Sequence, residues 1–161
     1  ADRAVNYGAE FEARVGLGFA AAWLAPSSLI ANYTRVFSDV TTPATALTAE
    51  RTGRPLQGQA PYVVNLGLTL VAPGVGTQLS VLYNRLGSRI VEVSSLLDED
   101  VVENPRDLLD LTLSQPFMGR YEARVAVRDV FEQNQTFSQG ADTIRADVRG
   151  RSISFGLSAR L

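Results

Sequence analysis

The 161-residue sequence predicts an all-β protein whose strands cross a membrane as part of an antiparallel β-barrel. Apolar and polar residues alternate with a period of two in seven segments, as they do along a strand with one apolar face. Most of these segments exceed the roughly five or six residues of a typical soluble strand, and a transmembrane strand needs about 9 to 11. Short and long connections alternate between them, which is typical of outer-membrane barrels.

The first strand is expected over residues 6–19, where the even positions hold only Asn, Gly, Glu and Arg. Its odd positions are apolar or aromatic and are Tyr7, Ala9, Phe11, Ala13, Val15, Leu17 and Phe19. The pattern is less regular over residues 28–40, but apolar residues still alternate there with Asn and Thr. The third expected strand covers residues 62–70, in which every even position is apolar.

Four more strands complete the predicted set. They cover residues 77–93, 106–114, 121–128 and 149–161. The last two are the clearest, because Tyr, Ala and Val alternate with Glu and Arg in one, and Ile, Phe and Leu alternate with Ser and Gly in the other. The segment at 77–93 is less regular than its neighbours.

The connections between these strands differ in length and composition. The short ones carry the Pro and Gly of tight turns and cover residues 19–27, 73–76 and 116–120. The long ones are polar and cover residues 40–60, 93–105 and 132–149. Outer-membrane barrels have short periplasmic turns and long extracellular loops, so we expect the long connections outside the cell and the C-terminus on the periplasmic side.

Composition excludes several function classes. The chain has no Cys and no His, so disulfides, thiolate nucleophiles, imidazole catalysis and the usual zinc sites are excluded. A formal net charge of -2 argues against a nucleic-acid partner. No apolar run reaches the roughly 20 residues of a transmembrane helix. The first residues have no signal-peptide pattern and no initiator Met, so we expect a processed chain or a piece of a longer one.

The apolar face of the expected strands is predicted to contact lipid. The residues assigned to it are Phe11, Val15, Leu66, Leu68, Leu111, Val125, Phe155 and Leu157. Aromatic residues near expected strand ends fit either an interfacial girdle or ordinary packing. These aromatic residues are Tyr7, Tyr33, Tyr62, Tyr83, Tyr121 and Trp23.

Charged residues of the polar face form two ladders. One contains Glu10, Glu12 and Arg14, and the other contains Glu122, Arg124 and Arg128. They fit two roles, contact with a plug or a passing solute, or ion pairing across strands, and we favour pairing across strands. Glu10 and Glu12 are too generic to indicate glycosidase chemistry, so we expect no enzyme.

An acidic stretch in one long connection is the only candidate metal site. It contains Asp98, Glu99 and Asp100, with Glu103 nearby. It offers the hard oxygen ligands that Ca²⁺ prefers, but it lacks the glycine and the spacing of an EF-hand. We therefore expect a solvated loop without a metal or a cofactor.

Several runs, in order along the chain, resemble the C-terminal strands of TonB-dependent receptors. Asn6–Arg14 resembles the "yGxExE" strand of this family, and 31–34 with 38–40 looks like the next strand. Further similar runs are 53–65, 82–90, 109–112 and 127–131, and 150–158 is similar to the family's last strand. The family usually ends in Phe or Trp, whereas this chain ends in Leu161.

The resemblance implies that residues 1–161 are the C-terminal portion of a 22-stranded receptor barrel, with neither the plug nor the TonB-binding box in this sequence. It implies active uptake of a scarce ligand, such as a siderophore, cobalamin, a saccharide or a peptide, across the outer membrane of a Gram-negative bacterium. The implied partners are outer-membrane lipid, the remaining barrel strands and plug, and TonB. A passive porin-like or structural barrel and a soluble β-rich binding module remain alternatives, and the ligand-binding residues are not identified.

Overall fold

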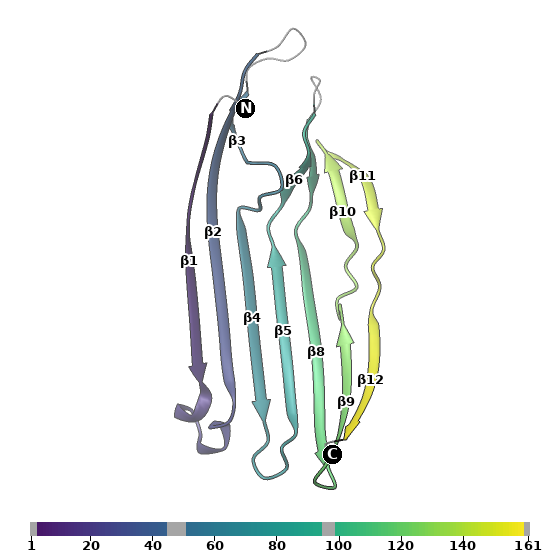
Figure 1. The fold of residues 1–161 in the computed structure, drawn as a ribbon. Coiled ribbons are helices and arrows are strands. Elements are labelled where there is room, and N and C mark those ends of the chain that lie inside the picture. Colours follow the sequence, from purple (N-terminus) through teal and green to yellow (C-terminus); the bar gives the residue numbers. More distant parts are fainter. Residues whose placement is uncertain (1–2, 45–50, 95–98, 160–161) are drawn as a thin grey trace.

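The computed structural model describes residues 3–44, 51–94 and 99–159, and it is built from two antiparallel sheets. The main sheet has the order β1-β2-β4-β5-β8-β9-β12, so the seven expected strands lie side by side in chain order (Figure 1). These strands are β1 (Arg3–Gly16), β2 (Ser28–Thr42), β4 (Tyr62–Val71), β5 (Gln78–Leu86), β8 (Arg106–Phe117), β9 (Tyr121–Arg128) and β12 (Ser152–Ala159), with β3 (Arg51–Arg54) paired on β2.

A second, four-stranded sheet, which the sequence pattern does not predict, lies at the upper end of Figure 1. Its order is β11-β10-β7-β6, with bounds β6 (Arg89–Glu92), β7 (Val101–Glu103), β10 (Gln135–Gln139) and β11 (Asp142–Asp147). The long connections, expected as polar loops, therefore contain strands over much of their described length. They pair with one another through backbone hydrogen bonds instead, and Phe137 lies opposite Glu103 in this pairing.

The expected strand at 77–93 is two strands, β5 and β6, because the chain breaks at Gly87 and Ser88. The Gly87 N–H donates to the Tyr62 carbonyl at 2.9 Å. A Cβ atom at Gly87 would lie 3.0 Å from the Tyr62 ring, which is closer than nearly all real contacts. The break therefore depends on a glycine that packs against the start of β4.

The first expected strand also ends earlier than predicted. β1 stops at Gly16, and Leu17–Phe19 and Ala22–Leu24 form two short 3-10 helices, η1 and η2. Ser27 is buried beside them, and its Oγ accepts a hydrogen bond from the Val71 N–H at 3.0 Å. This contact ties the turn after β1 to the end of β4. Residues 160–161 of the last expected strand lie outside the described residues.

The main sheet is a single layer. The buried hydrophobic side chains of the described residues are Val40, Ala60, Ile90 and Phe137, and they lie towards the end that carries the second sheet. The accessible surface is 10643 Å², whereas a compact monomer of 17.4 kDa exposes about 7,900 Å². Within the described part of the chain, neither face of the main sheet is therefore covered by a hydrophobic core.

Candidate functional site

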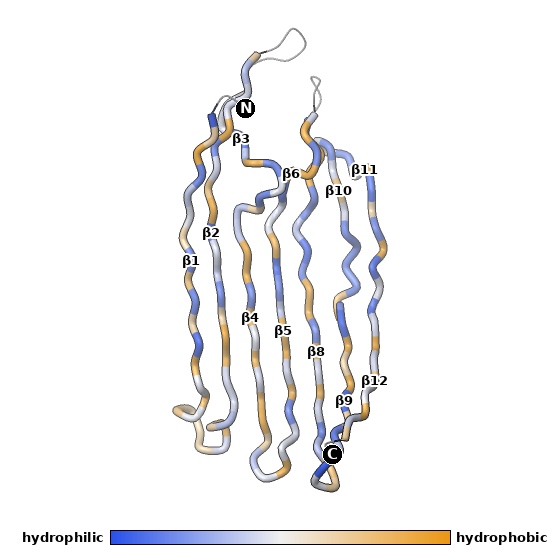
Figure 2. The backbone as a smooth tube through the Cα atoms, viewed as in Figure 1, coloured by the Kyte–Doolittle hydropathy of each residue, from blue (hydrophilic) through white to orange (hydrophobic). Residues whose placement is uncertain are grey.

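One face of the main sheet is apolar across all seven strands. The register aligns one residue from each strand into a continuous row, which is Val15, Leu29, Leu68, Val81, Leu111, Val127 and Ile153. A second row contains Leu70, Leu79, Leu113, Val125 and Phe155. All eight residues assigned to the apolar face from the sequence lie on it, because the antiparallel register preserves the alternation of each strand. Figure 2 shows this alternation along the strands.

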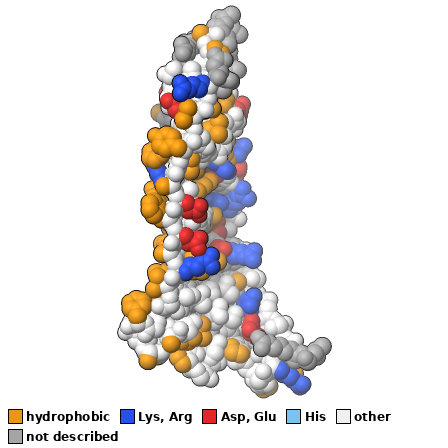
Figure 3. Space-filling model, turned by 60° about the vertical axis from the view of Figure 1, so that its left-hand side comes forward, with side chains coloured by type: hydrophobic (Ala, Val, Ile, Leu, Met, Phe, Trp, Pro, Cys, Tyr) orange, Lys and Arg blue, Asp and Glu red, His pale blue; other side chains and the backbone are white. Residues whose placement is uncertain are grey.

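The apolar face is widely exposed in this chain. Phe155 and Leu157 expose 80% and 72% of their surface, and Phe11 exposes 66%. Figure 3 shows hydrophobic side chains along one margin of the molecule and charged side chains towards the other side. Burying such an aromatic or aliphatic side chain is worth about 1.5 to 3 kcal/mol. The face therefore favours an apolar environment that residues 3–44, 51–94 and 99–159 do not supply.

Aromatic residues gather towards both ends of the apolar face. Tyr7 and Phe37 stack with ring centroids 5.3 Å apart on the side of the second sheet. Phe117 and Tyr121 stack at 5.6 Å beside the short turn at the opposite end. Both pairs join neighbouring strands, so they also stabilise the pairing of β1 with β2 and of β8 with β9.

A polar network, which no motif in the sequence indicated, ends the apolar face below the second sheet. Arg85 Nη1 lies 2.7 and 2.6 Å from the two carboxylate oxygens of Asp107, and its Nε donates to the Tyr62 hydroxyl at 3.1 Å. The Tyr83 hydroxyl donates to Asp107 Oδ1 at 2.5 Å. Arg35 lies opposite Tyr62 in the pairing of β2 with β4, so it belongs to the same level of the sheet.

Hydrogen-bonded amides cross the opposite, polar face. Asn32 donates to Glu10 at 2.5 Å, Asn65 donates to Asn32 at 3.3 Å, and Asn84 donates to Asn65 at 2.5 Å. This amide ladder joins β1, β2, β4 and β5. The three Asn residues were not singled out from the sequence, because they are far apart in the chain and meet only through the sheet register.

The predicted charge ladders lie on the polar face, but the expected ion pairs across strands do not form among the described residues. Arg14 pairs with Glu12 of its own strand at 2.6 Å, and Arg124 pairs with Glu122 of its own strand at 3.2 Å. The reason is that the residues opposite are neutral, for example Ile30 opposite Arg14. Arg128 lies opposite Ser152.

The polar face also contains an apolar hollow of about 410 Å³. Gly67 forms its floor, because a Cβ there would meet Leu82 at 3.4 Å and Ile30 at 3.9 Å. Leu82 and Ile30 are 57% and 43% exposed. Asn65, Asn84 and Asp110 surround them, so the hollow is an apolar spot within a polar surface.

The acidic residues considered as a metal site interact with protein groups in the structure. Asp100 Oδ2 lies 2.8 Å from Arg54 Nε, and Glu103 Oε2 lies 2.8 Å from Arg89 Nη2. The Glu99 carbonyl accepts a hydrogen bond from Gln139 at 2.8 Å, and Asp98 lies outside the described residues. Among residues 3–44, 51–94 and 99–159, no cluster of acidic side chains could hold a metal ion.

Both edges of the main sheet are open. In the described part of the chain, β1 pairs only with β2, and β12 pairs only with β9. Because every neighbouring pair is antiparallel, the first and the seventh strand run in the same direction. Direct closure of β1 on β12 would therefore require a parallel pair. No helix within the described ranges is long and apolar enough to cross a membrane.

Comparison of the chain with models of protein families, with curated proteins and with solved structures finds no match to any of them.

Proposed function

We propose that this chain is a section of the wall of an outer-membrane β-barrel, with its apolar face in lipid and its polar face towards the interior. The observation that carries the proposal is the apolar face itself, which continues across seven strands of a single-layer sheet without a core behind it. A soluble sandwich buries its apolar face against a second sheet. A lipid bilayer supplies the same apolar environment without a second sheet.

The dimensions of the apolar face support this reading. On β8, the face extends from Leu109, next to the Asp107 network, to Phe117 beside the short turn. The eight residue-to-residue steps between them, at about 3.4 Å each, correspond to roughly 27 Å of strand. At a tilt of about 40°, this length spans roughly 21 Å of membrane thickness, close to the band of about 25 Å in known outer-membrane barrels. Aromatic pairs near both ends fit the interfacial girdles of such barrels.

The open edges support a wall section that other strands complete. An unpaired strand edge in hydrocarbon exposes N–H and C=O groups that cost several kcal/mol each. An odd number of added strands between β12 and β1 keeps every neighbour antiparallel. This is what the C-terminal seven strands of a 22-stranded TonB-dependent receptor need, because the remaining 15 strands then join the two edges.

Within this proposal, the chain takes part in TonB-dependent uptake of a scarce ligand, such as a siderophore, cobalamin, a saccharide or a peptide. The plug and the contact with TonB come from polypeptide outside this sequence. The short turns and the C-terminus lie in the periplasm, and the second sheet lies outside the cell. The resemblance of the strand motifs, in their order along the chain, distinguishes this reading from a passive pore with the same wall.

Site-directed spin labelling tests the membrane location. Because the chain has no Cys, single cysteines at Leu111 and Val125 can be labelled, with Thr112 and Ala126 on the other face as matched controls. In native outer membranes, labels at Leu111 and Val125 should be relaxed by oxygen and shielded from a water-soluble nickel complex. The opposite pattern would place the apolar face in a protein core and favour the soluble module.

Uptake measurements test the transport class separately. Cells that carry the whole protein should accumulate one of a panel of radiolabelled ferric siderophores, cobalamin and oligosaccharides. Accumulation should stop when TonB is deleted or when the proton gradient is dissipated. Uptake that continues in both cases would favour the passive pore.

A further inference from the structure

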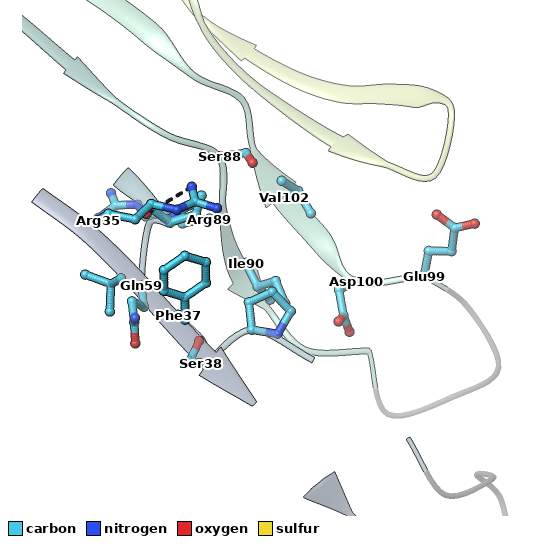
Figure 4. A pocket seen from close by; sticks show the side chains of 13 residues that line it. Arg35, Phe37, Ser38, Gln59, Ser88, Arg89, Ile90, Glu99, Asp100 and Val102 are labelled. Carbon is cyan, nitrogen blue, oxygen red and sulfur yellow. Dashed lines mark hydrogen bonds between the residues drawn. The ribbon is translucent and has the colours of Figure 1, made fainter. Parts of the chain in front are cut away.

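We propose that a cavity beside the upper end of β2 binds a phosphate group carried on an apolar body. The cavity has a volume of about 600 Å³ and lies between β2 on one side and β6 and β7 on the other (Figure 4). The cavity lies beside the part of β2 that continues past its last pair with β4, Arg35 with Tyr62. Successive residues of β2 from Arg35 to Ser38 line it, so side chains from both faces of the strand reach it. Nothing in the transport proposal requires it.

The cavity is held in shape by the segment between β3 and β4. The Leu56 N–H donates to Ser38 Oγ at 2.9 Å, and the Gly58 N–H donates to the Ile90 carbonyl at 2.8 Å. The Gln57 side chain donates to the Val91 carbonyl at 2.8 Å. These bonds fix the segment to β2 and to β6, so the cavity exists before any ligand enters.

Positive charge is concentrated on one side of the cavity. Figure 4 shows Arg35 and Arg89 next to each other, with the Phe37 ring beside them. Among the described residues, Arg35 forms no ion pair, and its remaining polar contact is Nη1 to the Pro61 carbonyl at 3.3 Å. Arg89 pairs with Glu103 but its side chain is 36% exposed. Each guanidinium has five N–H donors, so both retain donors for a ligand.

Two acidic side chains near the cavity are already paired. Glu103 offsets the charge of Arg89, so Arg35 supplies the uncompensated positive charge. Arg54 neutralises Asp100 at 2.8 Å, and both of these side chains are nearly buried. Glu99 is exposed and lies on the opposite side of the cavity from Arg35 in Figure 4. An anion at Arg35 and Arg89 therefore meets the charge of Arg35 and the remaining N–H donors of Arg89, whose Glu103 partner is already paired.

The donors favour phosphate over a simple carboxylate. Guanidinium groups bind phosphoryl oxygens in pairs, and two of them match an anion with three free oxygens. Arg35 stands over the Phe37 ring at 4.7 Å, and this cation–π contact holds its guanidinium in place.

The position of Arg35 and Phe37 indicates that the ligand carries an apolar group next to its phosphate. Both lie on the apolar face, and Phe37 stacks on Tyr7, which is 66% exposed. A phosphate in the cavity therefore lies directly above apolar surface. This argument rests on the proposed membrane location, in which the phosphate belongs to a lipid headgroup and the acyl chains follow the face. A soluble phosphate ester offers the same phosphate chemistry without the chains.

The test uses the whole protein purified from membranes in detergent and measures binding by ³¹P NMR titration. The probes are short-chain phosphatidic acid, glycerol phosphate and short-chain phosphatidylcholine. The variants are R35Q, R35K and R89Q, with R128Q as a matched control on the other face of the sheet. Heat-modifiable migration on gels checks that each variant is folded.

Phosphatidic acid should bind about tenfold or more weakly to R35Q and R89Q, whereas R128Q should bind like the wild type. R35K should lie between them, because it keeps the charge but loses the planar fork. Equal binding of glycerol phosphate and phosphatidic acid would assign the site to a soluble phosphate ester. Binding that is unchanged in R35Q and R89Q would overturn the proposal. The spin-label experiment is independent of these results, so a failed membrane location and a failed phosphate site are distinguishable.

Discussion

A buried charge in the middle of the apolar face provides the sharpest test of its environment. Leu113 lies four residues from both Leu109 and Phe117 on β8, which is about 14 Å along the strand from either end of the face. Its cross-strand neighbours are Leu79 and Val125, so no polar group of the sheet is opposite. Leu113→Arg therefore places a guanidinium at the greatest depth that the face offers.

In lipid, Leu113→Arg should lower the free energy of unfolding by about 2 to 4 kcal/mol, which is roughly 30- to 700-fold in the equilibrium constant. The same change at Leu109, beside the polar network, should cost about 0 to 1 kcal/mol, because the penalty falls towards the membrane interface. Thr112→Arg is the matched control, since Thr112 lies next to Leu113 but on the polar face. Guanidinium titration of the whole protein in lipid vesicles, followed by tryptophan fluorescence, measures these differences.

Two results would refute the reasoning. A penalty as large at Leu109 as at Leu113 indicates a protein core, because packing costs do not follow membrane depth. No penalty at either position indicates that the face is in water, where Leu113 is already 45% exposed and an Arg side chain is tolerated.

Three further predictions concern strand pairing and topology. Gly8→Ala should destabilise the protein by about 1 to 3 kcal/mol, because its Cβ would lie 2.4 Å from the Arg35 carbonyl oxygen. Gly16→Ala is the control and should be near neutral in the same thermal melt, because a Cβ there would have no atom within 4 Å. Equal effects of the two substitutions would contradict the β1–β2 register. Protease added to intact cells should cleave within residues 41–59, 94–104 or 133–147 and leave the turn at 73–76 intact. Cleavage at that turn in sealed cells would reverse the proposed topology. Residues 1–161 expressed alone should give no heat-modifiable, protease-resistant band in detergent, and a stable monomeric barrel would disprove the wall-section reading.

The position and the faces of the seven main strands were predictable because a period of two is a local property. Residues 121–128 are a strand in both the prediction and the structure, and the strands expected at 62–70 and 28–40 differ from β4 and β2 by one or two residues at one end. Alternation decides which side chains share a face before any partner strand is known. The residues of the apolar face could therefore be predicted from the sequence and the antiparallel order of the strands.

Contacts that depend on register and on distant pairing were decided by the tertiary structure alone. β7 contains only three residues and pairs with β10 more than thirty residues later, so neither carried a periodic pattern that could indicate a strand. Asn32, Asn65 and Asn84 form a ladder only because the pairings of β2 with β4 and of β4 with β5 align them. Arg85 meets Asp107 through the pairing of β5 with β8. Local sequence sets the direction of each side chain, but the side chain opposite is set by the register between strands. The register in turn depends on the length of every turn and on the pairing of remote segments.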